Sequence, residues 1–240
     1  MKRFYEKHEL AFAIVWIVLY VNLFSMADNA SRALGTEKLI TFPVAAAMSI
    51  ILLCWLKRHG LFEKYGLCRP KASARQFLYY FPLLLIVSCN AWFGLCMNMS
   101  LVESLIYVLT MLCVGFLEEL VFRGFLFKAM ARDSVKAAII VSSLSFGIGH
   151  IVNLFNGSGA EMLPTLCQIC YAVAAGFMFV MIFHRGGSLL PCIAAHSGMN
   201  MLSAFGVEPG EAGRIFTAIA LCVISLGYAV YLDKKLRWQQ

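Results

Sequence analysis

Long apolar stretches recur along the whole chain and are separated by short polar segments. Most are close to about 20 residues long, the length that an α-helix needs to cross the roughly 30 Å hydrocarbon core of a bilayer. The pattern predicts eight membrane-spanning helices, at approximately residues 10–27, 39–56, 76–97, 104–127, 136–155, 163–183, 187–205 and 213–232. The first run is longer than the apolar region of a signal peptide, which has about 7–15 residues, so we expect a retained span.

The composition supports a membrane protein. Hydrophobic residues make up 61% of the 240 positions and charged residues 14%, against about 45–50% and about 25% in an average soluble domain. The connections are too short for a separate soluble domain. We therefore predict an all-α fold, a polytopic membrane helical bundle that forms a single domain over residues 1–240.

The net charge of +7 does not indicate a nucleic-acid-binding protein, because the basic residues are dispersed among the loops. They are also distributed unequally between the two sides of the predicted bundle. One side carries 16 Lys and Arg in its loops and span ends, and the other carries only Arg32, Lys38 and Arg214. The positive-inside rule then places both termini in the cytoplasm, which agrees with an even number of spans. The nine cysteines lie mostly in apolar runs and predict no disulfide framework.

Three ionisable residues interrupt the fourth apolar run: Glu118, Glu119 and Arg123. Each costs roughly 2.5–3.5 kcal/mol near a bilayer centre on insertion scales, so we expect the protein interior to use them. Glu119 and Arg123 are four positions apart and share a helix face, which favours an ion pair. Glu118 is turned about 100° from Glu119 by the helical period. The spacing predicts a structural pair and leaves Glu118 as the carboxylate that can act as a base.

Two further predicted helices carry polar side chains at the same spacing of four. Phe146 and His150 share a face of the fifth helix, with Gly147 and Gly149 between them, and His196 and Asn200 share a face of the seventh. The glycines would allow a neighbouring helix to approach closely. With a rise of 1.5 Å per residue, Glu118, His150 and His196 lie roughly 20, 22 and 14 Å from the cytoplasmic ends of their helices. All three are near the middle of the membrane and can meet.

Glutamate, two histidines and an asparagine in a wet cavity suit hydrolysis by an activated water. A carboxylate and an imidazole can deprotonate the water, while a second imidazole and an amide N–H can stabilise the oxyanion that forms on a carbonyl. The alternative is a zinc or other divalent metal ion bound by Glu118, His150 and His196, although the soluble zinc-protease pattern His-Glu-x-x-His is absent. Both uses remain open from the residues alone.

These residues resemble the motifs of the CPBP intramembrane proteases, also called CAAX proteases, Abi proteins or type II CAAX prenyl endopeptidase-like proteins. The family's motifs are Glu-Glu-x-x-x-Arg, Phe-x-x-x-His and His-x-x-x-Asn, in this order on successive core helices. The chain matches all three, over a protease core at about 104–205, while its first three helices carry no matching motif. The resemblance implies that Glu118 and His150 activate the water and that His196 and Asn200 stabilise the oxyanion. Glu119, Arg123 and Phe146 would then support the site, and we expect no catalytic metal.

The first functional hypothesis is therefore an intramembrane endopeptidase whose protein or lipidated peptide substrate enters laterally or from the cytoplasmic side. The short chain suggests a bacterial cell-membrane protein, for which bacteriocin maturation or immunity is a compatible setting. The second hypothesis is a membrane scaffold or bacteriocin-immunity protein that keeps the site only to bind a partner. A proton-coupled transporter is a third, since carboxylates and histidines also form proton relays, but the chain shows no inverted repeat.

Overall fold

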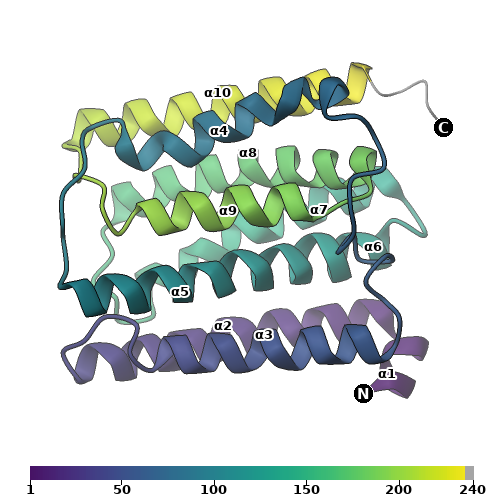
Figure 1. The fold of residues 1–240 in the computed structure, drawn as a ribbon, viewed down its shortest axis with the longest axis horizontal. Helices are drawn as coiled ribbons and strands as arrows, with labels where there is room; N and C mark the ends of the chain where they lie inside the picture. Colours follow the sequence, from purple (N-terminus) through teal and green to yellow (C-terminus); the bar gives the residue numbers. More distant parts are fainter. Residues whose placement is uncertain (236–240) are drawn as a thin grey trace.

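The computed structural model describes residues 1–235, and within them every regular element is a helix and no strand is present (Figure 1). The predicted all-α membrane bundle is confirmed. The helices run as follows: α1 Lys2–Lys7, α2 Glu9–Ala33, α3 Thr41–Arg58, η1 Ala74–Tyr80, α4 Phe81–Val87, η2 Ser88–Ala91, α5 Leu101–Glu118, η3 Glu119–Phe127, α6 Lys128–Met130, α7 Val135–Gly149, η4 His150–Leu154, α8 Met162–Gly186, α9 Leu190–Leu202 and α10 Glu211–Lys235.

The predicted number of spans needs correction from eight to six. Within residues 1–235, six helices are long and apolar enough to cross a membrane: Glu9–Ala33, Thr41–Arg58, Leu101–Met130, Val135–Leu154, Met162–Gly186 and Glu211–Lys235. The runs predicted at 76–97 and 187–205 are helical but short. The first is broken, because Leu78, Tyr79 and Tyr80 adopt left-handed backbone angles and leave α4 with seven residues. The second forms α9, whose 13 residues rise about 20 Å, less than the roughly 30 Å core.

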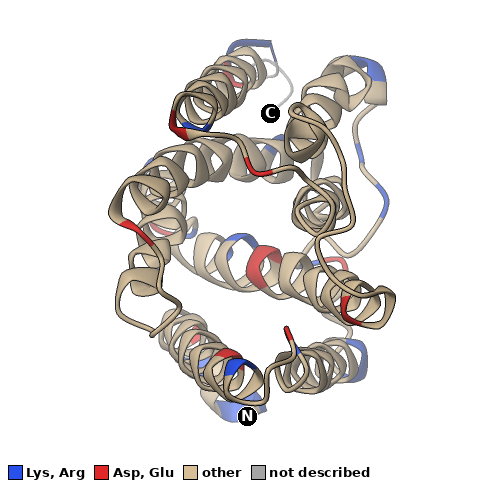
Figure 2. Ribbon diagram, turned by 90° about the vertical axis from the view of Figure 1, so that its left-hand side faces the viewer, with Lys and Arg blue, Asp and Glu red and all other residues tan. Residues whose placement is uncertain are grey.

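The helical segments run up and down the bundle, and the shorter segments of α4 and α9 make the return crossings between α3 and α5 and between α8 and α10 (Figure 1). The loops therefore gather at two ends of the bundle. One end, which we call the basic end, carries residues 1–8, 59–75, 131–134 and 187–189. Acidic residues at or next to this end pair with basic ones, as in Lys64 with Glu9 and Arg185 with Asp233. The opposite end carries residues 34–40, 92–100, 155–161 and 203–210. Figure 2 shows acidic and basic segments mainly at the helix ends, with one charged stretch on a helix inside the bundle. Arg237 lies outside the described residues.

The helix that bears the paired glutamates lies at the centre and changes its geometry there. α5 packs against α3 and α9, and the following segment η3 contacts α2 and α7. Residues 119–127 form a π-helix, in which hydrogen bonds span five residues instead of four. All nine of its residues are buried. Such wide turns are frequent at functional sites, where they redirect side chains. The sequence pattern did not predict this change of period.

Glycines allow the closest contacts between helices. Of Gly147 and Gly149 in the fifth predicted helix, only Gly147 has this role. A Cβ atom on Gly147 would come within 2.6 Å of the backbone nitrogen of Val173 on α8, and α7 packs closely on that helix. A Cβ on Gly149 would meet nothing within 4 Å. The prediction that both glycines allow close approach is therefore correct for Gly147 and wrong for Gly149.

Replacing Gly147 with Ala is expected to destabilise the protein by about 1–3 kcal/mol, the usual cost of overpacking a close-packed interior. The added methyl would force α7 away from the α8 backbone at Val173. Thermal unfolding of the purified protein in detergent measures the effect. Gly149→Ala on the same helix is the matched control and should not lower the unfolding temperature. Equal losses for both variants would contradict the packing argument.

Candidate functional site

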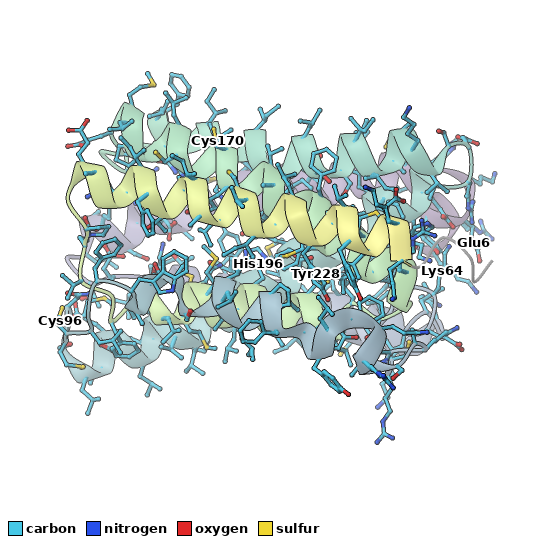
Figure 3. All side chains as sticks on the ribbon, turned by 90° about the horizontal axis from the view of Figure 1, so that it is seen from above. Glu6, Lys64, Cys96, Cys170, His196 and Tyr228 are labelled. Carbon is cyan, nitrogen blue, oxygen red and sulfur yellow. The ribbon has the colours of Figure 1, made fainter. Side chains whose placement is uncertain are left out.

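A cavity of about 380 Å³ lies inside the bundle, between α2, α5, α8, α9 and η4. The cavity is lined by Glu118, His150 and His196, the titratable residues of the predicted catalytic set, and by Asn200. Phe146 lines it as well, whereas Glu119 and Arg123 lie behind its wall. His196 lies near the middle of the long axis, between Cys96 close to one end and Lys64 close to the other (Figure 3). The structure thus brings the predicted residues of three helices to one place.

Glu118 projects into this cavity and makes two polar contacts. The hydroxyl of Tyr20, on α2, donates a hydrogen bond to its Oε1 at 2.6 Å. Its Oε2 lies 3.3 Å from Nε2 of His196. The side chain is 14% exposed, so it retains access to the cavity. Glu118 is therefore oriented from two sides while one face of the carboxylate stays open.

Glu119 points the other way, into the protein, and forms the predicted pair with Arg123. Its Oε1 lies 3.0 Å from Nη1 of Arg123, and both side chains are fully buried. The same oxygen lies 2.9 Å from Nδ1 of His196. The guanidinium also packs over the ring of Phe146, with 4.0 Å between Cζ and the ring centroid. A buried charge pair of this kind is stable only while each charge keeps its partner.

His196 is the link between the two glutamates. One ring nitrogen faces Glu119 and the other faces Glu118, while Phe179 stacks on the imidazole at a centroid distance of 5.9 Å. The Nδ1 contact with Glu119 is a hydrogen bond of 2.9 Å, and the Nε2 contact with Glu118 is a looser one of 3.3 Å. The imidazole is thus fixed on its Nδ1 side and faces the cavity carboxylate with its Nε2 side.

His150 and Asn200 are placed more loosely. The imidazole of His150 packs edge-on against Phe146, and its Nδ1 lies 3.2 Å from the Phe146 carbonyl oxygen one turn earlier. It lines the cavity, but among residues 1–235 it makes no hydrogen bond to Glu118 or His196. Asn200 lies one turn after His196 on α9, and its side chain likewise makes no hydrogen bond within that part of the chain. Both retain free capacity for a molecule in the cavity.

The three candidate metal ligands do not form a metal site. Glu118 and His196 are in contact, but His150 turns one nitrogen to its own helix. Within residues 1–235 no three His, Cys, Asp or Glu side chains come close enough together to hold a metal ion. A tetrahedral site needs three protein ligands at roughly 2.0–2.2 Å from one point, so this arrangement does not fit.

The sequence analysis missed Tyr20, because the first three helices carry no family motif. A signal was nevertheless present: Phe12, Trp16, Tyr20 and Phe24 repeat every four residues along α2 and form a buried aromatic stripe. Such a stripe indicates a face that packs inward, and the tyrosine is its one member with a hydroxyl group. Phe179 could not be recognised in this way, since α8 is apolar on all sides around it, from Ala172 to Phe183.

Comparison with known proteins agrees with the motifs. Residues 100–202 match a family model described as type II CAAX prenyl endopeptidase Rce1-like. The matched segment includes α5, η3, α7, α8 and α9, and with them all the motif residues, but not Tyr20 on α2. No curated protein and no solved structure matches the chain. Residues 100–202 of this integral membrane protein therefore form a domain of the Rce1-like, type II CAAX prenyl endopeptidase family.

Proposed function

We propose that the protein is an intramembrane endopeptidase that hydrolyses peptide bonds with a water activated by Glu118 and His150. The single observation that carries the proposal is the cavity that Glu118, His150, His196 and Asn200 line together. Membership of residues 100–202 in a protease family supports it. The mechanism uses no catalytic metal, in keeping with the poor fit of the three candidate ligands.

In the proposed reaction, the Glu118 carboxylate accepts one proton from a water molecule while the water oxygen bonds to the scissile carbonyl carbon. His150, with its free nitrogen in the cavity, holds the second hydrogen of this water. The carbonyl π electrons move to oxygen and create an oxyanion. When this intermediate collapses, the C–N bond breaks and the leaving amine takes the proton from Glu118. The products are a carboxylic acid, which keeps the second hydrogen of the water, and an amine, and proton transfer between them gives a carboxylate and an ammonium group.

Proton transfer to Glu118 also changes the partner of His196. Before the reaction, the negative charge of Glu118 attracts the Nε2 side of the imidazole. Once Glu118 is protonated, that attraction weakens at the moment when negative charge appears on the substrate oxygen. His196 can then donate to the oxyanion together with the amide of Asn200, since donors aimed at developing charge stabilise the transition state. Glu119 and Arg123 keep the imidazole in place through its Nδ1.

We propose that the protein resides in a bacterial cell membrane with both termini in the cytoplasm. The support is the concentration of Lys and Arg in the loops of the basic end, which the positive-inside rule assigns to the cytoplasm. The substrate is a protein or peptide in contact with the bilayer. Protease chemistry of this kind requires neither a cofactor nor nucleic acid.

The test of function is a comparison of peptide termini in membranes from cells that express the wild type or Glu118→Gln at equal levels. New termini that appear only with the wild type are expected, and they would identify the substrate as well. Identical termini, with both proteins folded and equally abundant, would contradict the protease and favour the scaffold or immunity hypothesis. The comparison works with an unidentified substrate, because every membrane protein in the cell is screened at once.

Tyr20→Phe is expected to lower kcat about 10-fold or more, because a hydrogen bond to a charged group contributes about 1.5–3 kcal/mol and about 1.4 kcal/mol is a factor of ten. KM should stay unchanged, since the hydroxyl orients Glu118 and does not bind substrate. The measurement is steady-state kinetics on a substrate found by terminus mapping. Tyr171→Phe removes a hydroxyl from the same cavity without touching Glu118 and is the control. Equal kinetics for both variants would refute the positioning role.

A further inference from the structure

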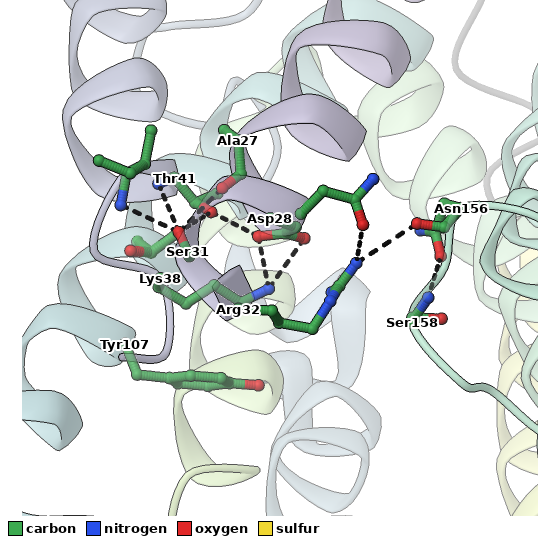
Figure 4. A network of polar contacts seen from close by, with 12 residues as sticks. Ala27, Asp28, Ser31, Arg32, Lys38, Thr41, Tyr107, Asn156 and Ser158 are labelled. Carbon is green, nitrogen blue, oxygen red and sulfur yellow. Dashed lines mark hydrogen bonds and ion pairs between the residues drawn. The ribbon is translucent and has the colours of Figure 1, made fainter. Parts of the chain in front are cut away.

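The catalytic cavity extends from Glu118 toward one end of the bundle only. Its lining includes residues of the opposite end or close to it, namely Asp28, Lys38, Tyr107, Asn156 and Ser203. Ser203 follows the last residue of α9 and is exposed, and Asn156 lies in the loop after η4. Figure 4 shows charged and amide side chains at this place, where Lys38 pairs with Asp28 and Arg32 donates to the Asn156 carbonyl. We call Asp28, Lys38, Tyr107, Asn156 and Ser203 the mouth of the cavity.

Between the cavity and the basic end, the bundle is closed. The residues of η3 are all buried, including the fully buried pair Glu119 and Arg123. Phe125 of η3 joins Phe12, Trp55 and Tyr65 in an aromatic plug next to this pair, and each of the four is at most 8% exposed. Their rings are in contact, with centroids 5.1 Å apart for Phe12 and Trp55 and 4.9 Å for Tyr65 and Phe125. No residue of 59–75, 127–136 or 184–189 lines the cavity. Close-packed interiors of this kind leave no passage for a peptide.

The part of the cavity between the mouth and Glu118 carries many amide and hydroxyl groups. Among them are Asn90, Asn153 and Gln168. Asn90 uses its nitrogen on the Met199 carbonyl, and Gln168 uses its oxygen on Asn153, so the Asn90 oxygen and the Gln168 nitrogen keep no partner within residues 1–235. A peptide main chain offers both donors and acceptors, and at membrane depth each must be paired. Amide side chains can pair with both, whatever the peptide sequence.

We infer that the site takes an extended, polar peptide segment that enters through the mouth from the non-cytoplasmic face, rather than a lipidated tail from the cytoplasm. This inference rests on the proposed function and on the cytoplasmic placement of the basic end. It replaces the expectation of cytoplasmic entry with entry from the opposite face of the membrane. The cleaved bonds should then lie in outward-facing segments of other membrane proteins, or at the outer ends of their spans.

A cysteine placed at the mouth tests the route. Ser203→Cys is expressed in intact cells, which are treated with a membrane-impermeant, cationic methanethiosulfonate reagent before new termini are mapped. The added group should lower the yield of Glu118-dependent termini by at least about 10-fold relative to the same variant without reagent, an obstruction equivalent to about 1.4 kcal/mol. The wild type is the control for native thiols, because Cys96 is exposed at the same end. Lys71→Cys, at the exposed basic end, should react only in inverted vesicles.

The possible results distinguish a wrong entry route from a wrong assignment of protease activity. Loss of cleavage after outside treatment of Ser203→Cys alone, with cleavage sites in outward-facing segments, would support the inference. Cleavage that continues after complete modification, or labelling of Ser203→Cys only in inverted vesicles, would overturn it and leave the protease intact. If untreated Ser203→Cys and wild-type cells both lack Glu118-dependent termini, the proposed function fails and the inference fails with it.

Discussion

Glu118→Gln is expected to lower the cleavage rate by about 100-fold or more, the usual contribution of a general base. Glutamine has nearly the same shape as glutamate, and its amide oxygen can still accept the hydrogen bond from Tyr20. It cannot accept a proton from water. The variant should therefore fold normally and lose only the chemistry. The measurement is the rate at which a substrate identified by terminus mapping is cleaved by purified enzyme in detergent or proteoliposomes.

Glu103→Gln provides the matched control for this substitution. Glu103 lies on the same helix as Glu118, where it completes a capping box with Ser100. Glutamine also serves in that position, so stability should be preserved. Its activity should equal that of the wild type. A Glu118→Gln protein that unfolds at the wild-type temperature and still cleaves substrate would remove Glu118 from the mechanism.

Arg123→Met is expected to cause the largest loss of stability, about 3–5 kcal/mol, because removing one partner leaves the other charge buried and unpaired. Both Glu119 and Arg123 are fully buried, and methionine supplies no positive charge. The free energy of unfolding in detergent, from denaturant titration, measures the effect. Activity should fall as well, since His196 is held through the same Glu119 oxygen.

Two further variants show whether the unpaired charge is the cause. Arg214→Met removes an arginine whose pair with Glu208 is largely exposed, and such pairs contribute about 0–1 kcal/mol. The double variant Glu119→Gln with Arg123→Met removes both charges and should recover most of the lost stability. A double variant that is less stable than Arg123→Met alone would show that the loss comes from packing and not from charge.

Several features of the fold could be predicted from the sequence because they depend on local periodicity and composition. Apolar runs located every long helix, since crossing a bilayer demands about 20 apolar residues. The same reasoning overcounted the spans at 76–97 and 187–205. Apolarity does not reveal a helix break such as the left-handed backbone at Leu78, Tyr79 and Tyr80, and it does not require a helix to cross the whole membrane.

The pairing within the site was predictable where it lay on one helix. Glu119 and Arg123 are four residues apart, and their ion pair forms as the spacing predicted. Contacts between helices were harder to predict. The sequence placed Glu118 and His196 at similar depth, yet it held no indication that His196 contacts both glutamates or that Tyr20 holds Glu118.

The sequence by itself determined the all-helical membrane architecture, the membership of residues 100–202 in the protease family and the set of polar residues that occupy the interior. Each of these follows from the composition and residue spacing within individual helical segments. Only the tertiary structure decided which side chains touch and where the cavity opens. The physical reason is that contacts such as Tyr20 with Glu118, 98 residues apart, depend on how helices rotate and pack against one another. The closed basic end arises in the same way, because its aromatic plug is assembled from segments that are distant in the chain.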